Sequence, residues 1–297
     1  MEQSEFLKWK KAGEISSQIM AKAIKLAKPE TPLLEIAEKL EEETEKLKVK
    51  WAFPINLSIN EIIAHNSPLY EDKTTATGLL KIDLGISVDG FISDIARTVD
   101  LTPEQKYKEM ISTNESALKD AIKIAKYGIE IREIGRIIQN SITKAGFSPI
   151  RNLAGHEMKQ YDLHAGLTIP NYDNGNTTKL KEGIYAIEPF ATIGEGIVID
   201  GKPSGVYILK EIKPVRNIQA RKIMEFIKNE YKTLPFSARW IIKKFGFGSL
   251  LSLKILEQQG ILHQFSQLIE KSRAPGSQVE DTILIEKNKV TVLTTAC

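Results

Sequence analysis

The chain of 297 residues is poor in several features that would mark a secreted or membrane protein. It has one cysteine, Cys297, so an intramolecular disulfide is impossible, as is usual in the reducing cytosol. No uninterrupted apolar stretch approaches the roughly 18 residues that a membrane-spanning helix needs. The first residues, MEQSEFLKWKK, lack the apolar core of a secretory signal. We therefore expect a cytoplasmic protein that has no membrane partner.

Hydrophobic periodicity divides the chain into helices, strands, helices and strands again. Apolar residues at helical spacing predict two helices over about 4–28 and 32–47, and two more over 103–126, opened by Thr102-Pro103, and 130–145. The strand-like segments are 51–65, 78–99, 148–170, 183–200, 205–212 and 278–294. This order predicts an α+β fold of two similar halves that meet near residue 150.

Residues 206–265 differ from the rest in charge. They hold eleven Lys and Arg against four Glu and no Asp, a net charge of +7. Because the whole chain carries +3, the remainder carries +3 − 7 = −4. Three short helices are predicted over about 216–231, 236–244 and 249–259, so we expect a compact basic helical insertion in a catalytic domain of residues 1–205 and 266–297. Such a segment suits contact with RNA or a ribosome, although a solvated basic surface without a partner is the simpler explanation.

A predicted hairpin brings two aspartates together. If Asp89-Gly90 is a two-residue turn, Val88 pairs with Phe91, and Asp83 and Asp94 lie diagonally on one face with Cα atoms roughly 7–8 Å apart. A shared dication would remove the repulsion between these carboxylates, although the pair alone is also explained as two exposed strand residues. The opposite face forms an apolar core side with Ile82, Leu84, Ile86 and Ile95.

Three further segments place polar side chains in apolar surroundings. His156 lies in a strand-like segment eight residues before His164, so both share a face if the strand is continuous. Glu188 interrupts an apolar strand directly before a proline, and Glu280 begins another, where an unpaired carboxylate is costly. Singly, the histidines are also explained by ordinary hydrogen bonds, and the glutamates by buried ion pairs.

Taken together, these positions form an acidic set of possible metal ligands. Four carboxylates and one imidazole are unlike a closed structural zinc site, which favours Cys and His. They suit a pair of divalent metals that share bridging carboxylates and a water. The sequence therefore indicates a metal-dependent hydrolase whose ligands are Asp83, Asp94, His156, Glu188 and Glu280.

The segments around these residues resemble the type II methionine aminopeptidases, which have the pita-bread fold. The matching stretches run from about residue 51 to 286 and are FPINLSINEIIAH, KIDLGISVDGFISDIA, NLAGHEMKQYDLHAG, YAIEPFATIGEG, TLPFSARW and QVEDTILI. Glu188 and Glu280 are 92 residues apart (280 − 188), which points to type II because type I enzymes lack an insertion there. The basic segment 206–265 is similar to the family's winged-helix-like subdomain. The long charged N-terminal extension of eukaryotic members is missing, so the chain resembles an archaeal member.

The resemblance implies a role for each candidate residue. Asp83 would chelate one metal, His156 would bind the other, and Asp94 and Glu280 would bridge both. Glu188 would be a ligand and the acid/base residue. The resemblance also implies that His65 lies near the substrate amine, that His164 bonds the substrate carbonyl, and that the methionine pocket is lined by Phe53 and Leu163. Phe265 departs from the pattern, where an aromatic residue with a hydroxyl is expected.

The implied reaction is removal of the initiator methionine from nascent polypeptides by a monomer with two divalent metals, drawn from Co, Mn, Fe or Zn. One alternative is an Xaa-Pro dipeptidase of the same fold, although those enzymes usually carry a separate N-terminal domain. Another alternative is a non-catalytic relative that binds RNA or the ribosome. Ribosome association through residues 206–265 is compatible with either the enzyme or this relative.

Overall fold

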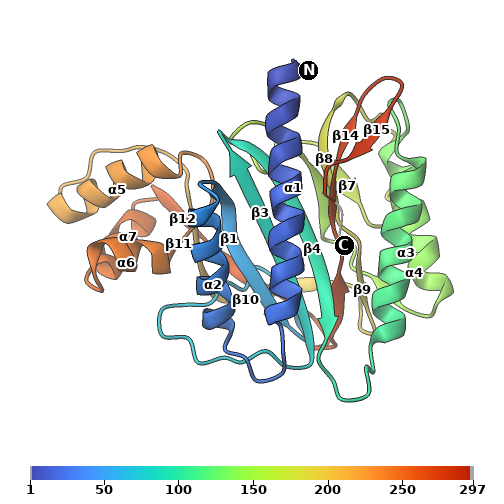
Figure 1. Cartoon of the computed structure of the whole chain (residues 1–297), viewed down its shortest axis with the longest axis horizontal. Coiled ribbons are helices and arrows are strands. Elements are labelled where there is room, and N and C mark those ends of the chain that lie inside the picture. Colours follow the sequence, from blue (N-terminus) through green and yellow to red (C-terminus); the bar gives the residue numbers. More distant parts are fainter. Residues whose placement is uncertain (1, 295–297) are drawn as a thin grey trace.

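The first half of the protein is an antiparallel sheet covered on one face by two helices. The computed structural model describes residues 2–294, so Cys297 lies outside the described residues. Helices α1 (Gln3–Leu26) and α2 (Leu33–Lys46) lie in front of the sheet in Figure 1. The sheet has the order β1-β3-β4, with bounds Lys50–Ile59, Leu79–Val88 and Phe91–Asp100.

The β3–β4 hairpin has the predicted register. Val88 pairs with Phe91, and Asp89 and Gly90 have φ of 54° and 87°, as a type I′ turn requires at both central positions. The apolar face of the hairpin packs under the helices, and the core there includes Ile82, Leu84, Ile86 and Ile95. Burying this face leaves Asp83 and Asp94 on the opposite face, away from α1 and α2.

The second half repeats this plan of two helices over a sheet. Helices α3 (Lys108–Ile124) and α4 (Ile131–Lys144) pack on a sheet of order β15-β14-β8-β6-β7. The strand bounds are Val290–Val292, Asp281–Ile285, Gly183–Ile187, Ala154–Met158 and Thr168–Pro170. A smaller sheet joins β13 (Gly276–Gln278), β9 (Phe190–Thr192) and β5 (Ser148–Pro149).

The start of α3 at Lys108 corrects the prediction that Thr102-Pro103 opens this helix. The Asp100 carboxylate accepts hydrogen bonds from the Thr102 N–H and hydroxyl and from the Tyr107 N–H. These bonds hold residues 101–107 in turns, and the helix begins only after them.

Two long strands lead from the two halves into the helical insertion. β10 (Val198–Leu209) pairs with β12 (Leu262–Glu270), in a sheet completed by β11 (Phe236–Ser237) and β2 (Ile62–Ala64). The expected insertion limits, 206 and 265, fall inside these two strands. Between them, three helices share an apolar cluster of their own (left in Figure 1): α5 (Ile218–Glu230), α6 (Ala238–Phe245) and α7 (Ser249–Gln258).

A buried ion pair fastens the insertion to the first half. Glu41 of α2 accepts two hydrogen bonds of 2.7 Å from the Arg239 guanidinium and one of 2.6 Å from the Trp240 indole, both on α6. Glu41 and Arg239 are 7% and 4% exposed. Across the described residues, no helix is long and apolar enough to cross a membrane.

Replacing Glu41 with alanine is expected to lower the free energy of unfolding by roughly 3–5 kcal/mol, because it leaves the Arg239 charge buried without a partner. Urea unfolding measures this difference. Glu42→Ala, which changes the exposed neighbour on the same helix, is the matched control and should change little. Equal effects of the two substitutions would contradict the assigned role of the pair.

Candidate metal centre

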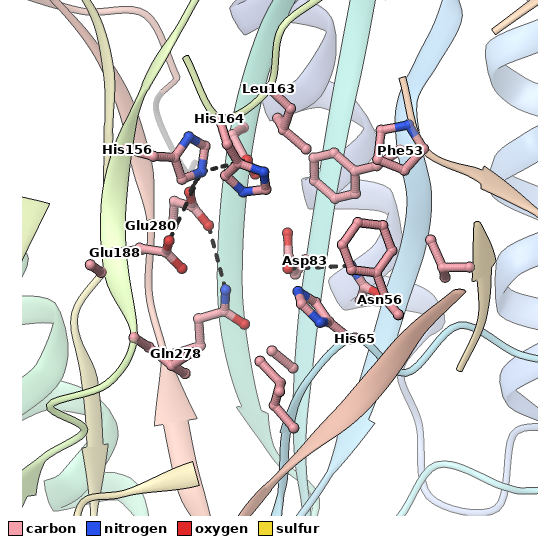
Figure 2. Close-up of a pocket in the computed structure, with 18 of the residues that line it drawn as sticks. Phe53, Asn56, His65, Asp83, His156, Leu163, His164, Glu188, Gln278 and Glu280 are labelled. Atoms are coloured by element: carbon pink, nitrogen blue, oxygen red, sulfur yellow. Dashed lines mark hydrogen bonds and ion pairs between the residues drawn. The ribbon is translucent and has the colours of Figure 1, made fainter. Parts of the chain in front are cut away.

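The five candidate ligands line one cavity, although they come from distant segments, and Figure 2 labels all of them except Asp94. Asp83 and Asp94 lie on β3 and β4, and His156 lies on β6. Glu188 follows β8, and Glu280 lies between β13 and β14. All five line a cavity of about 210 Å³ between the two halves.

The distances place His156 among three carboxylates. Its Nε2 lies 3.6 Å from Asp94 Oδ2, 3.9 Å from Glu188 Oε1 and 4.0 Å from Glu280 Oε1. Ligand atoms of Asp94, His156 and Glu280 all lie within 4.8 Å of one another, which is the spacing of groups that share a metal ion. Asp83 lies across the cavity beside Asn56 (Figure 2).

Hydrogen bonds between β4 and residues 280–282, at the start of β14, fix the two halves at this point. Ala96 and Glu280 exchange backbone hydrogen bonds of 3.0 and 3.3 Å. The Asp94 N–H donates to the Thr282 hydroxyl at 2.8 Å, and that hydroxyl donates to the Asp94 carbonyl at 2.7 Å. Arg97 donates to the Glu280 carbonyl at 2.6 Å and to the Asp281 carboxylate at 2.8 Å. Asp94 and Glu280 are therefore held in one rigid frame.

The site concentrates negative charge where water is largely excluded. Burial raises the pKa of Asp94 to about 8. Burial first, and neighbouring carboxylates second, raise the pKa values of Asp83, Glu188 and Glu280 well above the usual range. Burial lowers the pKa of His156 to about 4, so its imidazole is neutral at pH 7 and able to bind a metal.

Several ligand atoms lack a protein partner, which tests whether a metal fits. Asp83 Oδ1, Asp94 Oδ1 and Glu280 Oε1 are buried, and no hydrogen-bond donor reaches them from the described residues. Buried acceptors of this kind are costly unless they are satisfied. Divalent cations satisfy them and offset the carboxylate repulsion, so the oxygen-rich donor set fits divalent metals.

Two further histidines border the same cavity. The His164 ring lies 4.4 Å from the His156 ring, and the His65 ring lies 5.5 Å from that of Phe265. Burial, followed by the nearby His164, lowers the pKa of His65 to about 4. His65 also has a φ of 60°, which is uncommon for a residue other than glycine and occurs at functional sites.

His164 reaches the cavity by a different route from the predicted one. β6 ends at Met158, so His156 and His164 do not share a continuous strand. A turn closed by hydrogen bonds between Lys159 and Asp162 carries the chain back, and His164 follows it. His164 is exposed as a residue, but removal of its ring from bulk water, together with the neighbouring His156, lowers its pKa.

The apolar wall of the cavity includes both predicted pocket residues. Phe53 and Leu163 are 6% and 8% exposed and lie next to each other in Figure 2. Phe265 also lines the cavity.

Two amides at the cavity were not singled out from the sequence. Asn56 donates to Asp83 at 3.4 Å, and Gln278 donates to Glu280 at 3.4 Å. Weak signals existed for both. Gln278 lies two residues before Glu280 and so on the same side of an extended chain, and Asn56 belongs to the strand-like segment after Trp51. Neither signal separates an amide that contacts a ligand from an ordinary strand residue.

Comparison with known proteins shows the family to which this chain is similar. The model of metallopeptidase family M24 matches residues 8–287. A methionine aminopeptidase of Pyrococcus abyssi is 45% identical over 288 residues, which cover 95% of this chain and 97% of that protein.

Solved structures share the fold at lower identity. The structure of a thermophilic Arx1 matches with a TM-score of 0.84 and 18% identity, covering 99% of this chain and 91% of that one. The prolidase of Pyrococcus horikoshii matches with a TM-score of 0.64 and 22% identity, covering all of this chain but 63% of that one.

The raised pKa of Asp94 predicts how the chelated protein responds to pH. The pKa rises from 3.8 to about 8 on folding. The protonated carboxyl therefore favours folding at low pH, and this contribution is lost as the pH rises toward 8. The melting temperature of chelated protein is expected to fall between pH 5 and 8. Adding Mn²⁺ should raise the melting temperature, and this rise should become larger from pH 5 to 8, because below pH 8 the metal must displace protons.

Differential scanning fluorimetry with and without chelator measures both trends. Asp94→Asn should make both the melting temperature of chelated protein and the effect of Mn²⁺ on it less dependent on pH, because the amide does not titrate in this range. A chelated protein whose melting temperature rises steadily over this interval would contradict the assignment.

Proposed function

The chain belongs to metallopeptidase family M24, and from this premise we propose that it is a methionine aminopeptidase. In this proposal it removes the N-terminal methionine of nascent polypeptides in the cytoplasm. The observation that carries the proposal is the placement of the acidic ligand set beside the apolar wall of Phe53 and Leu163, in a cavity of about 210 Å³. A cavity of this size suits one side chain together with the bond next to it.

The metal site would be formed by all five converging residues. Asp83, Asp94, His156, Glu188 and Glu280 would together hold the metal ions, and Mn, Fe, Co and Zn all suit these donors. When bound, divalent ions supply a water of lowered pKa and polarise the scissile carbonyl. Asn56 and Gln278 orient Asp83 and Glu280 through the hydrogen bonds described above.

Glu188 is the proposed proton carrier. It follows the last residue of β8, its side chain is 14% exposed, and its Oε1 lies 3.9 Å from His156 Nε2. Its pKa is raised by burial and by Asp94 and Asp83, which suits a carboxyl group that must accept and return a proton near neutral pH. Glu188 takes the proton of the attacking water and passes it to the leaving amine nitrogen.

The two histidines contact the substrate as neutral imidazoles. The lowered pKa of His164 keeps its imidazole uncharged at pH 7, so an N–H is available to donate to the oxygen of the scissile carbonyl. His65 faces the opposite side of the cavity, beside the position proposed for the free α-amino group (Figure 2). Methionine selectivity comes from the apolar wall, and Phe265 provides a ring there without a hydroxyl.

Release of methionine from Met-Ala-Ser tests the proposal directly. Chelated protein should be inactive, and adding Mn²⁺ or Co²⁺ should restore release. Glu188→Ala should abolish it, and Glu188→Gln, which keeps an oxygen ligand, should be inactive while retaining more metal. Metal content is measured alongside, so that loss of the base is separated from loss of the ion. Cleavage of Ala-Pro in place of Met-Ala-Ser would overturn the proposal in favour of an Xaa-Pro dipeptidase.

His164→Ala is expected to lower kcat for Met-Ala-Ser by about 10²–10³, the usual effect of removing one donor to a developing oxyanion. The KM and the metal content should change little, since His164 is not in the proposed ligand set. Steady-state kinetics with metal analysis measure these quantities. A rise in KM at unchanged kcat would instead assign His164 to ground-state binding.

A further inference from the structure

A second cavity, larger than the metal cavity, separates the insertion from the first half. It measures about 800 Å³. One wall comes from α1, α2, β1 and the β3–β4 turn, and the other from the end of α5 and from α6 (Figure 1). We call it the lysine groove after six lysines that line it: Lys11, Lys48, Lys50, Lys232, Lys243 and Lys244.

The groove has an excess of unpaired positive charge. Its six lysines are all exposed. It also has four acidic residues, but Glu41 is bound by Arg239, Glu230 by Lys50 at 2.7 Å and Asp89 by Lys8 at 2.9 Å. Only Glu45 is left. Within residues 2–294, no ion pair involves the other five lysines. The groove therefore attracts an anion that carries several charges.

Aromatic rings line the groove together with these lysines. Tyr231 and Trp240 line the groove and stack on each other, with centroids 5.8 Å apart, and Tyr231 also stacks on Phe236 at 5.0 Å. Tyr161 lies on another part of the wall, with the Lys232 ammonium 3.7 Å from its ring centroid. Trp51 also lines the groove, and its indole N–H is a buried donor without a partner in the described part of the chain. The indoles of Trp51 and Trp240 are therefore the rings that offer stacking surfaces for bases, since Tyr231 lies between Trp240 and Phe236 and Lys232 covers Tyr161.

We propose that the lysine groove binds single-stranded RNA. Lysines along a groove follow a phosphate backbone, and aromatic rings between them stack bases without requiring a sequence. An acidic peptide would match the charge but leave the rings without flat partners. A membrane surface is too flat to enter a concave groove. The proposed RNA site therefore lies between the insertion and the first half and is not confined to residues 206–265. Lys11, Lys48 and Trp51 come from the first half.

The probe is a fluorescently labelled 12-nucleotide oligouridylate, titrated with the metal-loaded full chain while anisotropy is recorded between 50 and 300 mM salt. Binding should weaken steeply with salt. The double variant Lys11→Gln/Lys243→Gln removes one charge from each wall. If each lysine contacts one phosphate, the slope of log K against log salt should become shallower by about 1.4, and affinity at 0.1 M salt should fall roughly 10–30-fold.

The matched control is Lys25→Gln/Lys222→Gln, which removes two exposed lysines of α1 and α5 that do not line the groove. It should stay within about twofold of the unmodified chain, since neither residue faces the proposed path. Equal losses of affinity in both double variants would show that binding depends on diffuse surface charge and not on the groove, and would overturn the proposal. Absence of binding at 50 mM salt would overturn it as well.

Tryptophan fluorescence gives an independent measure of stacking. Trp51 and Trp240 line the groove, and Trp9 is buried in another apolar cluster. Oligouridylate should quench the emission, and Trp51→Phe should remove part of the quenching while retaining a ring. Quenching that is unchanged in both Trp51→Phe and Trp240→Phe would show that the RNA lies elsewhere. Release of methionine from Met-Ala-Ser by the lysine variants checks folding, since these residues lie outside the metal cavity.

Discussion

Repulsion among four buried carboxylates is the constraint to which the rest of the structure responds. Asp83, Asp94, Glu188 and Glu280 face one small cavity, and their pKa values are raised because burial and mutual proximity oppose ionisation. Burial of apolar side chains does not by itself favour this arrangement, because burying a carboxylate without a partner costs free energy. It persists because separate apolar cores on both sides of the cavity supply the stability, and because cations satisfy the acidic groups when they bind.

Neither half of the molecule holds a complete site. The first half contributes a hairpin with Asp83 and Asp94, and the second contributes His156, Glu188 and Glu280. The backbone bridge between Ala96 and Glu280 and the reciprocal bonds of Thr282 with Asp94 align the two contributions. Since these contacts lie directly behind the ligands, metal binding and docking of the halves reinforce each other.

The local parts of this site could be predicted from sequence, and the long-range parts could not. Asp89-Gly90 determines the hairpin register because a two-residue turn leaves one pairing, and that pairing puts Asp83 and Asp94 on one face. His156 and His164 would share a face only on a continuous strand, and His164 arrives through a turn instead, because side-chain alternation does not predict where a strand ends. The roles of Asn56 and Gln278 depend on which strands become neighbours. The start of α3 was likewise not predictable from local pattern, since the Asp100 carboxylate accepts a hydrogen bond from the Thr102 N–H and holds this residue in a turn.

The loop between Lys159 and His164 connects the two cavities of the molecule. Tyr161 faces the lysine groove, while Leu163 and His164 face the metal cavity. Three contacts hold Tyr161: its N–H donates to Gly90, its carbonyl accepts from the Thr233 hydroxyl, and Lys232 lies over its ring. A ligand in the groove changes the metal cavity only if it binds two positions of this loop with different affinity. Because both the β3–β4 hairpin and the insertion hold Tyr161, we expect the loop to occupy one position predominantly. In the proposed role, the groove would hold the protein on RNA, and the chemistry of the metal cavity would proceed independently of it.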